Sequence, residues 1–261
     1  MRVLINFADD YCKIIANAKH ELILNLARST LDCCRGGGAA GTAATVGLQI
    51  TQILWKMPQV TLSDQMKLNM LNYLSRNKKI HVQYRSMDLF EYPALPTTTS
   101  TIWAVKTVSH VSRPRYVIFG AQTSKKDVRV ADASNFDNCN IIDVRLFLNN
   151  KQYPYNRQEL NISNGLCAEL YHEYTKIQSS YYNNTEHRNP FLLTLTEFQE
   201  SPLFVFDCSK SDESLINSAV DIKLEIKARA AIPANTAGYC LLIYENSFSY
   251  SPFDGIVIKT V

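Results

Sequence analysis

Apolar and polar residues alternate with a period of two in several stretches of this chain. The clearest stretch is 220–229, where Val220, Ile222, Leu224, Ile226 and Ala228 are separated by charged residues. Residues 142–149 and 80–85 repeat the alternation, and residues 22–26 follow it less cleanly. A period of two places the apolar side chains on one face of an extended backbone. These stretches therefore predict strands with one buried face.

Other stretches are apolar at almost every position. They are residues 46–55, 102–108, 116–119, 203–206, 239–244 and 256–258. Continuous apolar runs of this length are typical of strands that are buried on both faces. Most of the prolines lie between the runs, where they remove no hydrogen bond from a sheet.

Two stretches, 62–74 and 166–181, instead carry apolar residues at helical spacing. The stripes are Leu62, Met66, Met70, Tyr73 and Leu74 in the first, and Leu166, Leu170, Tyr171, Tyr174, Ile177 and Tyr181 in the second. Thr61 and Asp64 form a capping-box-like pair in front of the first stripe. Many short strands with a few inserted helices predict an all-β sandwich or barrel, and they argue against a βαβ fold.

Two polar or glycine-rich breaks organise these elements. Residues 33–45 contain Gly36–Gly41 and are typical of a flexible loop, and residues 124–134 indicate an exposed loop. A further break at 109–115 separates two strand signals, so we place a domain boundary between residues 111 and 112. A chain of 261 residues is long enough for one large domain or two small ones.

Charge and cysteine content narrow the class of protein. The net charge of +3 with 20% charged residues is too small to indicate nucleic acid or an anionic membrane as partner. No apolar run approaches the ~20 residues that span a bilayer. The seven cysteines form no C-x-x-C pair, which favours free buried thiols in a reducing compartment. We therefore expect a soluble, intracellular protein with no membrane span.

Two partial motifs do not support catalysis or metal binding. The glycines at 36, 38 and 41 match G-x-G-x-x-G, but a β-type sequence follows them where a nucleotide-binding site needs a helix. His172-Glu173 begins a zinc-protease motif, but Lys176 stands where the second histidine is required. A G-x-S-x-G nucleophile motif is absent. We predict no catalytic residue, no metal, no cofactor and no small-molecule substrate, so the chain is not expected to be an enzyme.

The tyrosines of the second helical stretch raise one further possibility. Tyr171, Tyr174, Tyr181 and Tyr182 could stack on nucleic-acid bases, but few basic residues accompany them. Packing in a core or an interface is the stronger interpretation. Nucleic acid is therefore not directly indicated as a partner.

Seven residue strings resemble one protein family. They are FADDYCKIIANAKHELIL (7–24), RSMDLFEYPALP (85–96), IWAVK (102–106), RPRYVIFGAQT (113–123), FDNCNIIDVRLFLNNKQYP (136–154), FVFDCSKSDES (204–214) and PANTAGYC (233–240). Together they are similar to the double jelly-roll-like domain proteins of invertebrate genomes. Those proteins resemble the major capsid proteins of double-stranded DNA viruses and related mobile elements.

The resemblance implies two jelly-roll β-sandwiches side by side, each made of two four-stranded sheets. Because two full rolls usually need more than 261 residues, we expect a partial first roll followed by a nearly complete second one. Residues 1–111 are then the C-terminal part of the first roll, without its N-terminal strands, and residues 112–261 are the second roll.

The same resemblance implies a structural function. Three chains form a pseudo-hexagonal trimer, trimers tile a capsid, and the chain is part of a virion if it is viral. A domesticated, genome-encoded copy is also open. The candidate interface anchors are apolar or aromatic residues expected on loops: Tyr153, Tyr155, Phe248, Tyr250 and Phe253.

Two alternatives stay open. The first is a ligand- or glycan-binding β-sandwich, for which Phe136-Asp137-Asn138 is the candidate loop. The second is a host interaction module of viral descent that does not assemble capsids, and no sequence feature separates it from a capsid protein.

Overall fold

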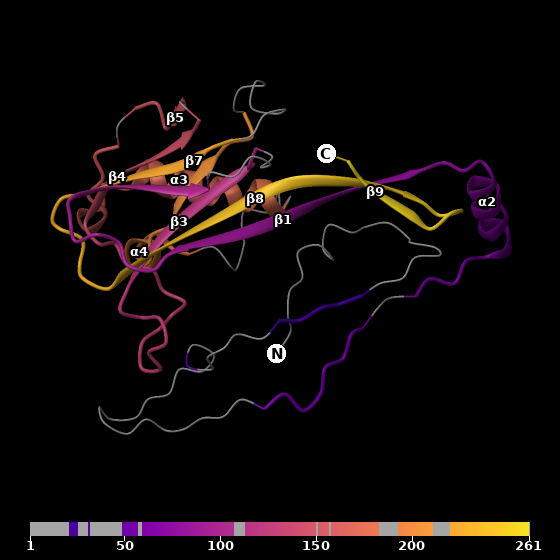
Figure 1. The fold of residues 1–261 in the computed structure, drawn as a ribbon, viewed down its shortest axis with the longest axis horizontal. Helices are drawn as coiled ribbons and strands as arrows, with labels where there is room; N and C mark the ends of the chain where they lie inside the picture. Colours follow the sequence, from indigo (N-terminus) through magenta and orange to yellow (C-terminus); the bar gives the residue numbers. More distant parts are fainter. Residues whose placement is uncertain are drawn as a thin grey trace. The chain divides into compact units, whose positions relative to one another are not determined.

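The computed structural model (Figure 1) describes residues 21–25, 31, 49–56, 59–106, 113–149, 151–156, 158–182, 193–210 and 220–260. The chain divides into two compact units. The first unit holds the described residues up to Ser86, except Leu31, together with Glu245 onward. The second unit holds Leu31 and the described residues between Met87 and Tyr244.

The strands in the described residues form two antiparallel sheets. The first sheet has the strand order β1-β8-β3-β6, with β9 paired to β8, and the second has the order β2-β7-β4-β5. The strands of the first sheet are β1 (Ile80–Tyr92), β8 (Thr236–Ser251), β3 (Tyr116–Thr123), β6 (Phe204–Asp207) and β9 (Ile256–Thr260). Those of the second sheet are β2 (Ser100–Lys106), β7 (Ile222–Ala228), β4 (Ile141–Leu148) and β5 (Lys151–Tyr153).

The strands from β1 through β8 pair in a nested order. The first strand pairs with the last, β1 with β8, and the pairs then nest inward as β2 with β7, β3 with β6 and β4 with β5. Figure 1 shows β8 between β1 and β3. This is the arrangement obtained when one long antiparallel hairpin is rolled into two facing sheets, which is a jelly roll. The predicted all-β jelly-roll sandwich with a few helices is therefore confirmed.

Alternating side chains fill the space between the sheets. On β7, Ile222, Leu224 and Ile226 are fully buried, while Lys223 and Glu225 between them are half-buried. This is the one-sided strand that the period of two predicted. Each such aliphatic side chain contributes about 1.5–3 kcal/mol when it leaves water. The core joins both sheets, because Trp103 of β2 packs edge-on against Phe119 of β3 with ring centroids 6.4 Å apart.

The alternation on β4 is interrupted by a bulge. The sequence pattern placed Ile142 inside and Asp143 outside, but Ile142 is half-buried and Asp143 is 1% exposed. The register with β7 shifts between Ile141 and Asp143, and one extra residue reverses the faces from there toward the N-terminus. The buried carboxylate is compensated, because Asp143 accepts hydrogen bonds from Arg145 Nε at 2.9 Å and from the backbone N–H of Gln158 at 3.3 Å.

Two predicted strands are wrong in the part that the structure describes. Residues 22–25 and 49–55 form no strand, and the rest of these two stretches, residue 26 and residues 46–48, lies outside the described residues. Ile53 and Leu54 are 60% and 68% exposed. An apolar run becomes a strand only where a second strand completes its hydrogen bonds. The polar loop at 124–134 is confirmed, since it contains turns and bends without a strand or helix.

The helices in the described residues are α2 (Asp64–Ser75), α3 (Ala168–Tyr182), α4 (Leu195–Glu200) and the short 3₁₀ turn η1 (Ile162–Asn164). The predicted cap of α2 is wrong, because Ser63 and not Thr61 precedes the helix, and Ser63 makes no side-chain capping bond. No residue of α2 is buried, so its apolar stripe is not a core face. On α3 the stripe is confirmed for Leu170, Tyr174 and Ile177, which are buried, whereas Leu166 precedes the helix and is 64% exposed.

The strands of the roll come from both sides of the predicted domain boundary. β1 and β2 precede residue 112 and pair with β8 and β7. The roll therefore draws on residues 80–106 as well as on residues after 112. The assignment of residues 1–111 and 112–261 to two rolls stays a prediction.

Four cysteines lie in the described residues, and all are buried free thiols: Cys139, Cys167, Cys208 and Cys240. The expectation of free buried thiols is confirmed for these four, while Cys12, Cys33 and Cys34 lie outside the described residues. Burial raises the pKa of the Cys208 and Cys240 thiols from 9.0 to about 12 in both cases.

This burial predicts a loss of stability at alkaline pH. Between pH 9 and about 12 the unfolded chain releases the protons of Cys208 and Cys240 while the folded chain retains them. The free energy of unfolding should therefore fall as pH rises above about 9. Urea unfolding followed by tryptophan fluorescence measures it. The Cys208→Ala variant should show a shallower decline between pH 9 and 11, and an unchanged slope would contradict the assignment.

The close approach of Phe136 to β3 gives a second stability prediction. A Cβ atom added at Gly120 would lie 2.5 Å from Phe136 Cδ1, whereas one at Gly238 would be 3.4 Å from its nearest neighbours. Gly120→Ala should therefore destabilise the fold by about 1–3 kcal/mol through overpacking. Gly238→Ala is the matched control and should cost clearly less. Equal losses for the two variants in thermal unfolding would refute this explanation.

Candidate functional site

The structure places the five candidate interface residues in different environments. Tyr155 is 86% exposed and Phe253 is 69% exposed, so both present most of the ring at the surface. Tyr153 lies in β5 and Phe248 in β8, and both are half-buried. Tyr250 also lies in β8 and is 2% exposed. Phe248, Tyr250 and Tyr153 are thus on strands and not on loops, and the interface role of all five stays a prediction.

Local hydrogen bonds hold the two exposed rings in short turns. Phe253 lies in the turn from β8 to β9, where the N–H of Gly255 donates to the carbonyl of Ser251 at 2.9 Å. Gly255 has a φ of +67°, a left-handed conformation that glycine adopts without a Cβ clash. Tyr155 follows β5, and its carbonyl accepts a hydrogen bond from Gln152 Nε2 at 3.0 Å. Both rings are therefore carried by backbone that is fixed to the neighbouring strands.

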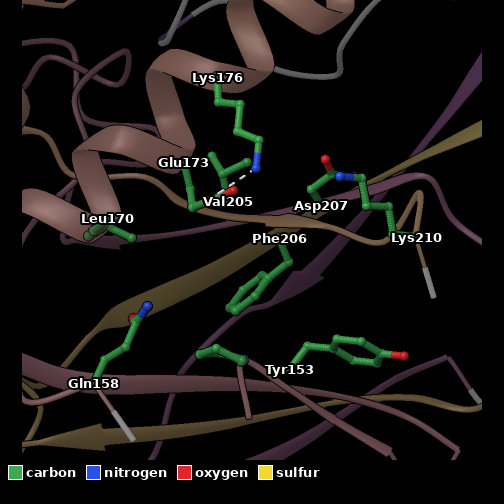
Figure 2. A pocket seen from close by; sticks show the side chains of 10 residues that line it. Tyr153, Gln158, Leu170, Glu173, Lys176, Val205, Phe206, Asp207 and Lys210 are labelled. Carbon is green, nitrogen blue, oxygen red and sulfur yellow. Dashed lines mark hydrogen bonds and ion pairs between the residues drawn. The ribbon is translucent and has the colours of Figure 1, made fainter. Parts of the chain in front are cut away.

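A pocket lies in the second unit where α3 meets β6 and the end of β5 (Figure 2). Its volume is about 260 Å³, and its lining residues are Tyr153, Pro154, Gln158, Leu170, Glu173, Lys176, Val205, Phe206, Asp207 and Lys210. Leu170, Val205 and Phe206 supply apolar walls, and Glu173 and Lys176 form an ion pair at 3.4 Å that Figure 2 marks.

The chemistry of this pocket is limited. The described lining residues include two carboxylates and two lysines, which balance in charge, and they include no histidine, serine or cysteine. Throughout the described residues, no group of three or more His, Cys, Asp or Glu side chains is placed to hold a metal ion. Small-molecule sites usually enclose about 300–1,000 Å³. The pocket is therefore suited to an inserted side chain better than to a cofactor.

The segment proposed for glycan binding is occupied by contacts within the chain. Asp137 accepts a hydrogen bond from the backbone N–H of Thr123 at 2.7 Å and pairs with Lys125 at 2.8 Å. The Phe136 backbone N–H donates to Ser201 Oγ, and Asn138 Nδ2 donates to Ser163 Oγ. These bonds tie the segment to β3, to η1 and to the end of α4, so most of its polar groups serve the fold, while Asn138 Oδ1 is buried without a hydrogen-bond partner among the described residues.

Tyr171 and Tyr174 of α3 are packing residues, as the sequence favoured. Tyr174 is 5% exposed and lies 6.2 Å from the Tyr171 ring and 5.1 Å from the Phe198 ring. Tyr171 Oη donates to the carbonyl of Leu193 at 3.0 Å. These rings fasten α4 and residue 193 to α3. The G-x-G-x-x-G stretch lies outside the described residues.

Exposed apolar side chains gather in the first unit, a feature that sequence reasoning missed. They are Met66, Leu68, Leu71 and Tyr73 on α2, Phe253 in the turn, and Ile256, Val257 and Ile258 on β9. The run 256–258 was expected to be buried on both faces, but its residues are 49–57% exposed. The apolar run itself was the available signal, because such a strand needs cover on both faces.

The helices in the described part of the chain are all too short or too polar to cross a membrane.

Comparisons with known proteins complete the description of the site. A family model described as the double jelly roll-like domain matches residues 1–247. None of the curated proteins matches the chain.

Three solved structures are similar in fold. A structure of the Sputnik virophage determined by cryo-electron microscopy is 13% identical, with a TM-score of 0.42, and the match covers 70% of this chain and 39% of that chain. The mavirus major capsid protein is 12% identical, with a TM-score of 0.40 and coverage of 70% and 42%. VP54 of PBCV-1, fitted into a reconstruction of the virophage Sputnik, is 11% identical, with a TM-score of 0.39 and coverage of 77% and 55%. The chain thus spans 39–55% of the length of these chains.

Proposed function

We propose that this chain, which belongs to the double jelly roll-like domain family, is a capsid-type structural protein that associates with its own copies. The observation that carries the proposal is the complete nesting of β1 to β8 into one closed roll. In such a roll the strands are hydrogen-bonded into two sheets, and side chains fill the space between the sheets. What remains for function is the outer surface and the loops.

The exposed aromatic residues support association through that surface. A Tyr or Phe ring that is mostly exposed in one chain gains free energy when a partner covers it, and aromatic residues dominate many interfaces. Tyr155 and Phe253 meet this condition. A homotrimer closes when one surface of each copy contacts a different surface of the next copy around a three-fold axis. Such trimers in a lattice are the form we propose, in a virion or as a genome-encoded copy without one.

The proposal also includes two rolls in the chain, of which the described roll is the second. The prediction assigned residues 1–111 to the first roll and residues 112–261 to the second. The pairing of β1 and β2 with β8 and β7 favours a boundary before Ile80. We therefore propose that the part of the chain assigned to the first roll ends before Ile80.

A ligand-binding sandwich is the second candidate, and the pocket beside α3 is the observation that favours it. The volume of about 260 Å³ is below the usual range for small-molecule sites. Among the described residues that line it, histidine, serine and cysteine are absent, as described above. Self-association is the better supported function, and we propose that the chain is not an enzyme.

Self-association predicts a mass above that of one chain. One chain has a mass of 29.6 kDa, so sedimentation velocity should show a species of three times that mass. The fraction of this species should increase with protein concentration. Negative-stain electron microscopy of the same fraction should show three-fold particles. A single species at the mass of one chain, up to the highest concentration that stays in solution, would contradict the proposal.

The interface anchors predict which variants weaken assembly. Tyr155→Ser and Phe253→Ser should each weaken association about tenfold or more, because truncating a buried aromatic anchor typically costs over about 1.4 kcal/mol. Val130→Ser is the control, since Val130 is 61% exposed but was not predicted to be an anchor. The trimer fraction in sedimentation velocity is the readout. Assembly that is equally strong in all three variants would reject Tyr155 and Phe253 as anchors.

A further inference from the structure

β9 is an edge strand with a single partner in the described part of the chain. It pairs with β8 in an unbroken antiparallel register from Ser251 opposite Ile256 to Ser247 opposite Thr260. Its other edge presents backbone N–H and C=O groups directed away from β8. Such an edge is a template for another strand.

The side chains of β9 are those of an inner strand. Ile256, Val257 and Ile258 are consecutive, so they point alternately to the two faces of the sheet, and they are 53%, 57% and 49% exposed. Folded proteins usually protect an edge by charges, proline, a bulge or very short length. Lys259 is the single charged residue of β9, and the register with β8 contains no bulge.

The other edge strands do carry protection. β5 has three residues and β6 has four. β2 has a register irregularity between Ala104 and Lys106. β1 is long, but charged residues recur along it, including Asp88 and Glu91. β9 is therefore the edge best suited to accept a strand from outside the chain.

We propose that β9 pairs antiparallel with β9 of a second copy, about a two-fold axis that passes between the two Ile258 residues. This inference rests on the proposed self-association and adds a contact of a different symmetry to it. In this register Ile258 faces Ile258, Val257 faces Lys259, and Ile256 faces Thr260. All five residues of each strand then have a partner.

The charge of Lys259 favours this register, in which β9 is complementary to β9 of a second copy. Centring the pair on Lys259 would oppose two lysines directly, which is destabilising. Centring it on Val257 would leave Lys259 opposite Gly255, outside the strand. With Ile258 at the centre, each Lys259 lies beside the apolar Val257 of the other copy, and the two ammonium groups lie on opposite sides of the axis. The strand is thus complementary to itself, as a two-fold interface requires.

A pair of charge variants tests the register. Val257→Glu places a carboxylate opposite Lys259 of the other copy twice per interface, and Val257→Lys places a second ammonium there. Both variants remove the same valine. We expect the Glu variant to associate through this contact roughly fivefold or more tightly than the Lys variant at low salt, with the difference shrinking as salt increases. Sedimentation equilibrium measures both constants, and equal constants would overturn the register.

A cysteine crosslink tests the contact itself. Opposed residues of an antiparallel pair have Cα atoms about 4.5–5.5 Å apart, a separation that a disulfide spans. The Ile258→Cys variant should therefore give a covalent dimer under mild oxidation, seen by non-reducing electrophoresis. Ile102→Cys on β2 is the control, because Ile102 is 69% exposed and lies outside β9. The unmodified chain shows how much crosslinking its own cysteines contribute.

The outcomes separate this inference from the function it rests on. If the unmodified chain associates but Ile258→Cys crosslinks no more than Ile102→Cys, the β9 contact is wrong and self-association stands. If the unmodified chain is a monomer at every concentration, self-association itself fails and this contact fails with it. Preferential crosslinking at Ile258, together with the predicted order of the two Val257 variants, supports the contact.

Discussion

The structure depends on backbone pairing between the two ends of one long rolled hairpin. β1 pairs with β8 and β2 with β7, so segments more than a hundred residues apart supply each other's hydrogen bonds. The pairing holds because the inward side chains of β7, among them Ile222, Leu224 and Ile226, are completely removed from water between the sheets. A shift of one residue would turn these side chains outward. The alternating pattern therefore fixes the register, and the register fixes the roll.

The described roll is filled with side chains, so the features available for contacts with other molecules lie mainly on its surface. The described residues contain no metal-ligand cluster, and the pocket beside α3 holds about 260 Å³ between apolar walls and balanced charges. Some apolar groups are exposed and do not pack in the core. They include the rings of Tyr155 and Phe253 and the apolar residues of β9. They are the kind of surface that gains stability when another chain covers it. The proposed self-association rests on this contrast between side chains that are packed inside the described roll and apolar groups that are left on its surface.

The sequence predicted the elements whose burial depends on local spacing. The period of two identified β7, and the helical spacing of Leu170, Tyr174 and Ile177 identified α3. Features that depend on distant partners were not predictable in this way. The bulge before Asp143 is visible only in the register between β4 and β7. The apolar run 49–55 forms no strand, because an apolar run alone does not supply a pairing partner. Among the five candidate anchors, Tyr155 and Phe253 are exposed and Tyr250 is buried. The burial of Tyr250 depends on the position of β8 in the sheet, which the sequence alone does not give.

Amide hydrogen exchange of the full chain, resolved by NMR, tests the rolled pairing most directly. The ladder that pairs Trp103 with Leu224 joins β2 to β7 across the predicted boundary at residues 111 and 112. If the two strands belong to one roll, the amides that donate across this ladder should exchange only through the same global unfolding event, with similar and large protection. Protection of β7 with fast exchange throughout β2 would show that the two segments fold separately, and it would contradict the single closed roll.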